Sequence, residues 1–131
     1  MEAIAMRPAE IDPALASKGD FDRVTNGAAR QIDQMREAAI FSDGALPARQ
    51  KALAATLWAI SARCEPCVKY YVDRSVRLGA TEAEIGEILA VACVMGGCVG
   101  EMWAMKAYHA YKGRAEGPPQ DADAPSCCSA H

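Results

Sequence analysis

With 131 residues, 51% of them hydrophobic, the chain has the size and composition of one folded domain with one core. Its net charge of −3 and its scattered basic residues exclude the electrostatic footprint of a protein that binds nucleic acid or an anionic membrane. No uninterrupted apolar run reaches the ~18 residues of a membrane span, and residues 1–7 do not form a secretory signal. The sequence therefore predicts a cytoplasmic protein without membrane or nucleic-acid partners.

The predicted fold class is all-α, because no segment shows the alternation typical of a strand. Residues 1–19 are expected to form an extended N-terminal arm, and residues 20–113 a helical domain. The first predicted helix begins at Asp20 or Asp22 and runs to about Phe41. Its apolar stripe would consist of Ile32, Met35, Ala39 and Ile40.

The next predicted helix, over residues 48–63, is apolar almost all round. Such a helix belongs inside a core or a subunit interface, so we expect a homo-oligomer. A further helix is predicted over residues 68–78, with Gly79 as its C-terminal cap.

Thr81 and Glu84 have the spacing of a capping box and predict the start of another helix. Gly96 and Gly97 are expected to break or bend it before a last helix over residues 99–112. Residues 114–131 form a predicted flexible tail that ends in Cys127-Cys128-Ser129-Ala130-His131.

The pair Cys64 and Cys67 is separated by two residues, which places both thiols within disulfide reach when the second begins a helix. Pro66 is compatible with a first helical turn. The unsatisfied amides and positive dipole of a helix N-terminus favour a thiolate, and a neighbouring thiol can resolve its oxidised product. The motif predicts reversible thiol–disulfide chemistry. Half of a zinc site, completed by Cys93 and Cys98, and an inert cysteine pair remain alternatives.

The stretch from about Leu46 to Lys112 resembles the carboxymuconolactone decarboxylase/AhpD-like superfamily, in the branch that carries a CxxC motif. The resembling pieces, in order, are Arg63-Cys64-Glu65-Pro66-Cys67, Gly79-Ala80-Thr81-Glu82-Ala83-Glu84-Ile85 and Met95-Gly96-Gly97. The resemblance implies an all-helical fold that assembles as trimers or hexamers. It also implies a peroxidase or disulfide-reductase activity that requires no cofactor and draws on a dithiol or disulfide reductant protein.

In that branch of the family the second cysteine attacks and the first resolves, which would make Cys67 the nucleophile and Cys64 its partner. Two positions depart from the family pattern: Tyr71 stands where the family has a histidine, and Ala52 where it tends to have a glutamate. Tyr71 would line the site, but a phenol of ordinary pKa near ~10 is a poor base at neutral pH. We therefore predict weak peroxidase turnover, unless His109 supplies the missing proton transfer.

A second hypothesis is a binding protein for a soft metal ion such as Cu(I), or for a metalloid. Cys98, Met102 and Met105 share one face of the last predicted helix, although the same pattern is typical of ordinary core packing. The ligand set of this alternative is Cys64, Cys67, Cys98, Met102, Cys127 and Cys128. A lactone-decarboxylase-like enzyme is a weaker alternative, because that branch of the superfamily has no need of the CxxC motif.

Overall fold

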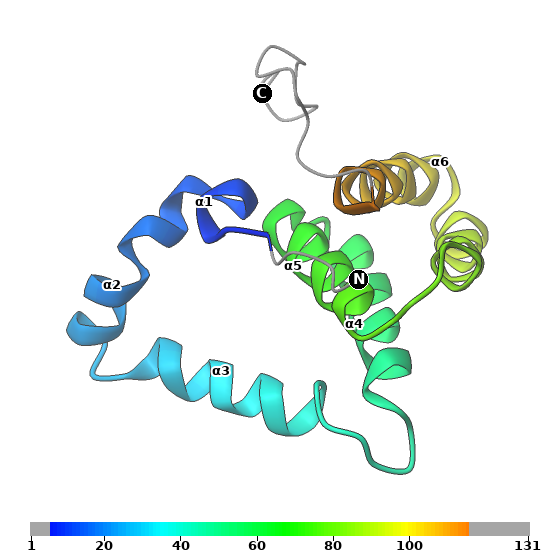
Figure 1. The fold of residues 1–131 in the computed structure, drawn as a ribbon. Helices are drawn as coiled ribbons and strands as arrows, with labels where there is room; N and C mark the ends of the chain where they lie inside the picture. The colour runs from blue at the N-terminus through cyan, green and yellow to red at the C-terminus, as the bar shows by residue number, and fades with distance from the viewer. Residues whose placement is uncertain (1–5, 116–131) are drawn as a thin grey trace.

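The computed structural model describes residues 6–115, and every regular element in that range is a helix (Figure 1). The prediction of an all-α fold is confirmed. In chain order the elements are α1 (Pro8–Ile11), the 3-10 helix η1 (Pro13–Ser17), α2 (Lys18–Val24), α3 (Ala28–Ala39), α4 (Ala48–Ala62), α5 (Glu65–Arg77) and α6 (Glu82–Ala115).

The core lies where α4, α5 and α6 pack against one another. The helices α1 to α3 form an arc on one side of the α4–α5 pair, and α6 covers another side (Figure 1). Apolar side chains of all three long helices are buried in the shared core, among them Leu53, Ile60, Val68, Val72, Ile85, Leu89, Ala104 and Ala107.

The N-terminal third differs from the prediction in two ways. Residues 8–17 form short helices instead of an extended arm. The single helix expected up to about Phe41 is split into α2 and α3, because Asn26 (φ 56°) and Gly27 (φ 87°) adopt left-handed backbone conformations. Asp22 caps the helix after this break, since its carboxylate accepts a hydrogen bond from the Arg30 amide at 2.8 Å.

The apolar stripe predicted for this region is not a core face of α3. Ile32 is 42% exposed and Met35 is 63% exposed. The face of α3 that turns toward α5 is instead the one that carries Arg36 and Glu37, which bond to side chains of α5.

Two predicted features of α6 are present. Thr81 and Glu84 form the capping box, with the Thr81 amide donating to the Glu84 carboxylate at 3.0 Å and the Glu84 amide donating to the Thr81 hydroxyl at 3.2 Å. Gly97 bends the helix, because its φ of 59° and ψ of −142° are not helical. Gly100 is required just after the bend, since a Cβ there would collide with the Ala92 carbonyl oxygen.

By length and composition alone α6 is long and apolar enough to cross a membrane, with a mean hydropathy of 1.7 in its best window. The expectation that no segment is apolar over the length of a membrane span was wrong, because it considered only uninterrupted apolar runs. The bend at Gly97 divides the helix into two parts of roughly 22 and 27 Å, each shorter than the ~30 Å hydrocarbon core of a bilayer. Length and hydropathy by themselves therefore do not assign α6 to a membrane.

Large apolar side chains of α4 and α6 project outward from the chain, and we call this set the apolar face. Its members and their exposed fractions are Trp58 (77%), Val94 (83%), Met95 (81%), Val99 (51%), Met102 (47%) and Met105 (52%). The interpretation of Met102 and Met105 as core fillers is therefore wrong for the described residues of this chain.

Candidate functional site

The turn between α4 and α5 places the cysteine pair at the start of a helix. The Cys64 amide donates to the Ala59 carbonyl at 3.2 Å, and the Arg63 amide donates to the Ile60 carbonyl at 3.0 Å. This pair of backbone hydrogen bonds is typical of a helix that ends at a residue with left-handed backbone angles. Arg63 is that residue (φ 54°, ψ 42°). A single residue therefore separates the last helical residue of α4 from Cys64, the N-cap of α5.

Cys64 and Cys67 are joined as a disulfide, with their Cα atoms 5.2 Å apart. Pro66 occupies the first turn of α5, where its missing amide proton leaves no hydrogen bond unmade. Both cysteines are half-buried. The prediction that the motif brings two thiols together at a helix N-terminus is confirmed. The free amides and positive dipole of that terminus favour a thiolate when the pair is reduced.

Glu65, between the two cysteines, is a residue whose position the sequence reasoning missed. One carboxylate oxygen lies 3.5 Å from the Lys69 ammonium, and the other is buried without a hydrogen-bond partner among residues 6–115. A carboxylate in the first turn of a helix is commonly a solvated residue that favours the dipole, so its sequence position alone gave no signal. In this fold it places a buried hydrogen-bond acceptor without a partner inside the motif itself.

Tyr71 belongs to an aromatic cluster held between α3 and α5. The Arg36 side chain of α3 donates to the Tyr71 hydroxyl oxygen at 3.3 Å. The rings of Tyr70 and Tyr71 are 5.0 Å apart, and the Phe41 ring lies 6.1 Å from that of Tyr71. The phenol oxygen is thus already an acceptor for a guanidinium, which makes Tyr71 a poor substitute for a basic histidine.

Burial raises the pKa of Tyr70, so this neighbour of Tyr71 keeps its proton at neutral pH. For Arg36, burial works to lower the pKa, but its bond to Tyr71 and its ion pair with Asp33 prevail and raise it. A permanent positive charge therefore stands beside the position where the family has its histidine.

Ala52, the other departure from the family pattern, is fully buried in α4. Its carbonyl accepts from the Thr56 hydroxyl at 2.9 Å, the Thr56 and Ser75 hydroxyls are 3.5 Å apart, and Ser75 donates to the Tyr71 carbonyl at 2.7 Å. These buried hydroxyls are satisfied locally, and none supplies a base of useful strength near neutral pH.

His109 and Glu101 are exposed on α6, and neither makes a hydrogen bond or ion pair within the described range. Cys93 is half-buried and Cys98 exposed, and both are free thiols. No group of three or more His, Cys, Asp or Glu side chains in residues 6–115 is arranged to hold a metal ion. Cys127 and Cys128 of the alternative metal set lie outside the described residues.

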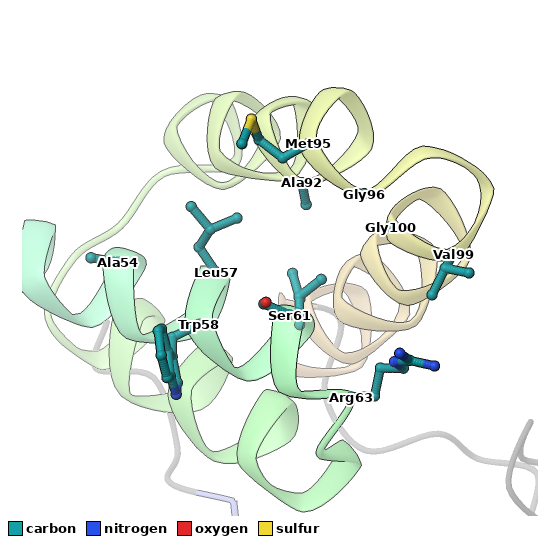
Figure 2. Close-up of a pocket in the computed structure, with 11 residues that line it drawn as sticks. Ala54, Leu57, Trp58, Ser61, Arg63, Ala92, Met95, Gly96, Val99 and Gly100 are labelled. Carbon is teal, nitrogen blue, oxygen red and sulfur yellow. The ribbon is translucent and has the colours of Figure 1, made fainter.

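A pocket of about 590 Å³ opens between α4 and both halves of α6 (Figure 2). It lies beside the turn that carries the motif but does not include either cysteine of the disulfide. Most of its lining is apolar, and its two polar residues are Ser61 and Arg63. The full set of lining residues is Ala54, Leu57, Trp58, Ile60, Ser61, Arg63, Ala92, Met95, Gly96, Val99 and Gly100.

Fold and site together define a small helical protein with a disulfide-forming CxxC pair at a helix N-terminus. Residues 26–110 match the family model named "Carboxymuconolactone decarboxylase family", and the chain belongs to this family. The resemblance noted in the sequence is thereby confirmed.

A similar solved structure is that of the apo form of a carboxymuconolactone decarboxylase family protein from Legionella pneumophila. It is 27% identical with a TM-score of 0.74, and the match covers 82% of this chain and 96% of that one. A curated relative is an uncharacterized protein of Cupriavidus necator, 40% identical over 65 residues, or 50% of this chain. The match spans 58% of that relative's length.

Proposed function

We propose that this protein is a thiol–disulfide oxidoreductase or alkylhydroperoxidase-like protein, with Cys67 as nucleophile and Cys64 as resolving thiol. The observation that carries the proposal is the Cys64–Cys67 disulfide at the N-terminus of α5. Family membership supports the same chemistry.

With a hydroperoxide, the Cys67 thiolate attacks the terminal oxygen, an S–O bond forms and the O–O bond breaks, so that Cys67 becomes a sulfenic acid. The alkoxide that leaves takes up the proton released when the Cys67 thiol ionised, and departs as an alcohol. The Cys64 thiol then condenses with it, releasing water and forming the disulfide. An external dithiol, the reductant class that the family resemblance implies, returns two electrons and two protons and restores both thiols. With a disulfide substrate, the same pair exchanges through a mixed disulfide.

Limited alkylation of the reduced protein tests the assignment of Cys67. Near pH 6.5 we expect Cys67 to be labelled at least about tenfold faster than Cys98, because the reagent reacts with the thiolate and the N-terminus of α5 favours the thiolate of Cys67. Peptide mapping by mass spectrometry at limiting reagent measures the two rates.

Cys98 is a stringent control because it is exposed, whereas Cys67 is only half-buried, so exposure alone predicts the opposite order. Cys64→Ser should leave the fast labelling of Cys67 intact. Preferential labelling of Cys98, or of Cys64 in the native chain, contradicts the nucleophile assignment.

We also propose that the apolar face is covered in a homo-oligomer, a trimer or hexamer by analogy with the family. Val94→Glu, which places a charge at the most exposed member of that face, is expected to shift the mass toward the monomer. Light scattering at micromolar concentration measures the mass. Val24→Glu is the matched control, since Val24 is 64% exposed on α2, outside that face. A monomeric native protein would refute the proposal.

A further inference from the structure

The pocket of Figure 2 contains one charged group in an otherwise apolar lining. Arg63 lies at the end of the pocket nearest to Val99, and Ser61 is its one other side chain with a hydrogen-bonding group apart from the Trp58 indole (Figure 2). Arg63 is exposed and makes no ion pair within residues 6–115. Most other arginines of the described range are paired with a carboxylate.

The backbone at Arg63 adds an independent observation. The residue that ends α4 is left-handed, with φ 54° and ψ 42°. Glycine is the usual residue at such a position, and another residue there is held at an energetic disadvantage. Local strain of this kind gathers at ligand-binding positions, where the side chain has a use that glycine lacks.

We propose that this pocket binds an elongated apolar molecule that ends in a carboxylate. Its carboxylate would pair with the Arg63 guanidinium, which offers two parallel N–H donors. Its apolar chain would lie between α4 and α6 against Leu57, Trp58 and Met95. The volume of about 590 Å³ is within the range of small-molecule sites. This proposal does not depend on the thiol chemistry.

Trp58, Met95 and Val99 line the pocket and also belong to the apolar face, so a second copy of the chain is the other conceivable occupant. The proposal requires that the homo-oligomer covers Val94, Met102 and Met105 and leaves the pocket open. An apolar surface from another copy would remove water from Arg63 without offering it an acceptor, which is unfavourable for a charged group. The unpaired guanidinium therefore favours an anionic ligand.

Isothermal titration calorimetry of decanoate into the full chain tests the proposal, with decanoate kept below its micellar concentration. We expect saturable binding of one decanoate per chain, with decanol binding about tenfold more weakly. Arg63→Gln should weaken decanoate about tenfold and leave decanol unchanged, the size of effect for one charge-assisted pair at a partly exposed site. Ala54→Phe, which fills the pocket from an exposed helix position, should weaken both ligands.

Lys51→Gln is the control for charge, because it removes a cation from α4 at a residue that does not line the pocket. It should change decanoate affinity less than twofold. Equal losses in Arg63→Gln and Lys51→Gln would overturn the proposal, as would the absence of saturable binding. Binding to a dissociated Val94→Glu variant but not to the assembled native protein would assign the pocket to a second copy and overturn it as well.

Discussion

The double variant Ala52→Glu/Tyr71→His is expected to consume hydroperoxide about 10²-fold faster than the native protein, the lower end of the usual gain from general acid–base help. A histidine at position 71 would stand beside Arg36, whose positive charge disfavours the imidazolium. The imidazole would therefore stay neutral and able to accept the proton of the attacking thiol. A glutamate at position 52 would complete the relay of the family pattern.

The single variants should gain less, for different reasons. Tyr71→His has a base without its orienting acid. Ala52→Glu places a carboxylate at a fully buried position without a partner, so we expect a loss of stability beside its smaller gain in turnover. The assay is hydroperoxide consumption with a dithiol reductant. Rapid native turnover that Tyr71→Phe leaves unchanged would assign the proton transfer to another group, such as Glu65 or His109.

Asp73→Ala is expected to lower the free energy of unfolding by about 3–5 kcal/mol, the usual loss when one partner of a buried ion pair is removed. Asp73 is 2% exposed, and its carboxylate accepts from the Met6 amide at 3.1 Å and pairs with Arg114 near the end of α6. Arg114 has a side chain only 8% exposed, and two of its nitrogens make no hydrogen bond in the described range. Without Asp73 this guanidinium would be buried and unpaired.

Urea denaturation at fixed protein concentration measures the effect, since assembly adds a concentration-dependent contribution. Asp20→Ala is the control, because its ion pair with Arg23 is at the surface and is expected to contribute less than about 1 kcal/mol. Replacing both members, as Asp73→Leu/Arg114→Met, should restore much of the loss. A loss below 1 kcal/mol for Asp73→Ala would mean that water reaches Arg114.

The sequence predicted the helical core and the position of the CxxC pair where local rules decide the outcome. The left-handed Gly79, the capping box at Thr81 and the bend at Gly97 depend on a few neighbouring residues, and all three are present. The position of the CxxC pair is also local, because a helix end and a helix start meet there within two residues.

The sequence failed where the outcome depends on contacts between distant segments. The break at Asn26 and Gly27 is an exception, because an Asn-Gly pair is a local turn signal that the prediction of one long helix overlooked. The Asp22 carboxylate stabilises the second helix rather than the first. The contact of Arg36 with Tyr71 joins residues 35 positions apart, so no periodic pattern announces it. Exposure of the apolar face likewise cannot be separated from core packing by periodicity, because both produce the same apolar spacing.

The disulfide closes one of the shortest loops that two cysteines can form, since only two residues lie between them. The loop-closure entropy that such a ring removes from the unfolded chain corresponds to about 2 kcal/mol, well below the value for a cross-link that spans a domain. The first turn of α5 also holds Cys64 and Cys67 near each other through backbone geometry alone. The pair can therefore gain or lose two electrons with a smaller change in the free energy of unfolding than a cross-link between distant segments would cause, so that its redox state is coupled less tightly to its folded state.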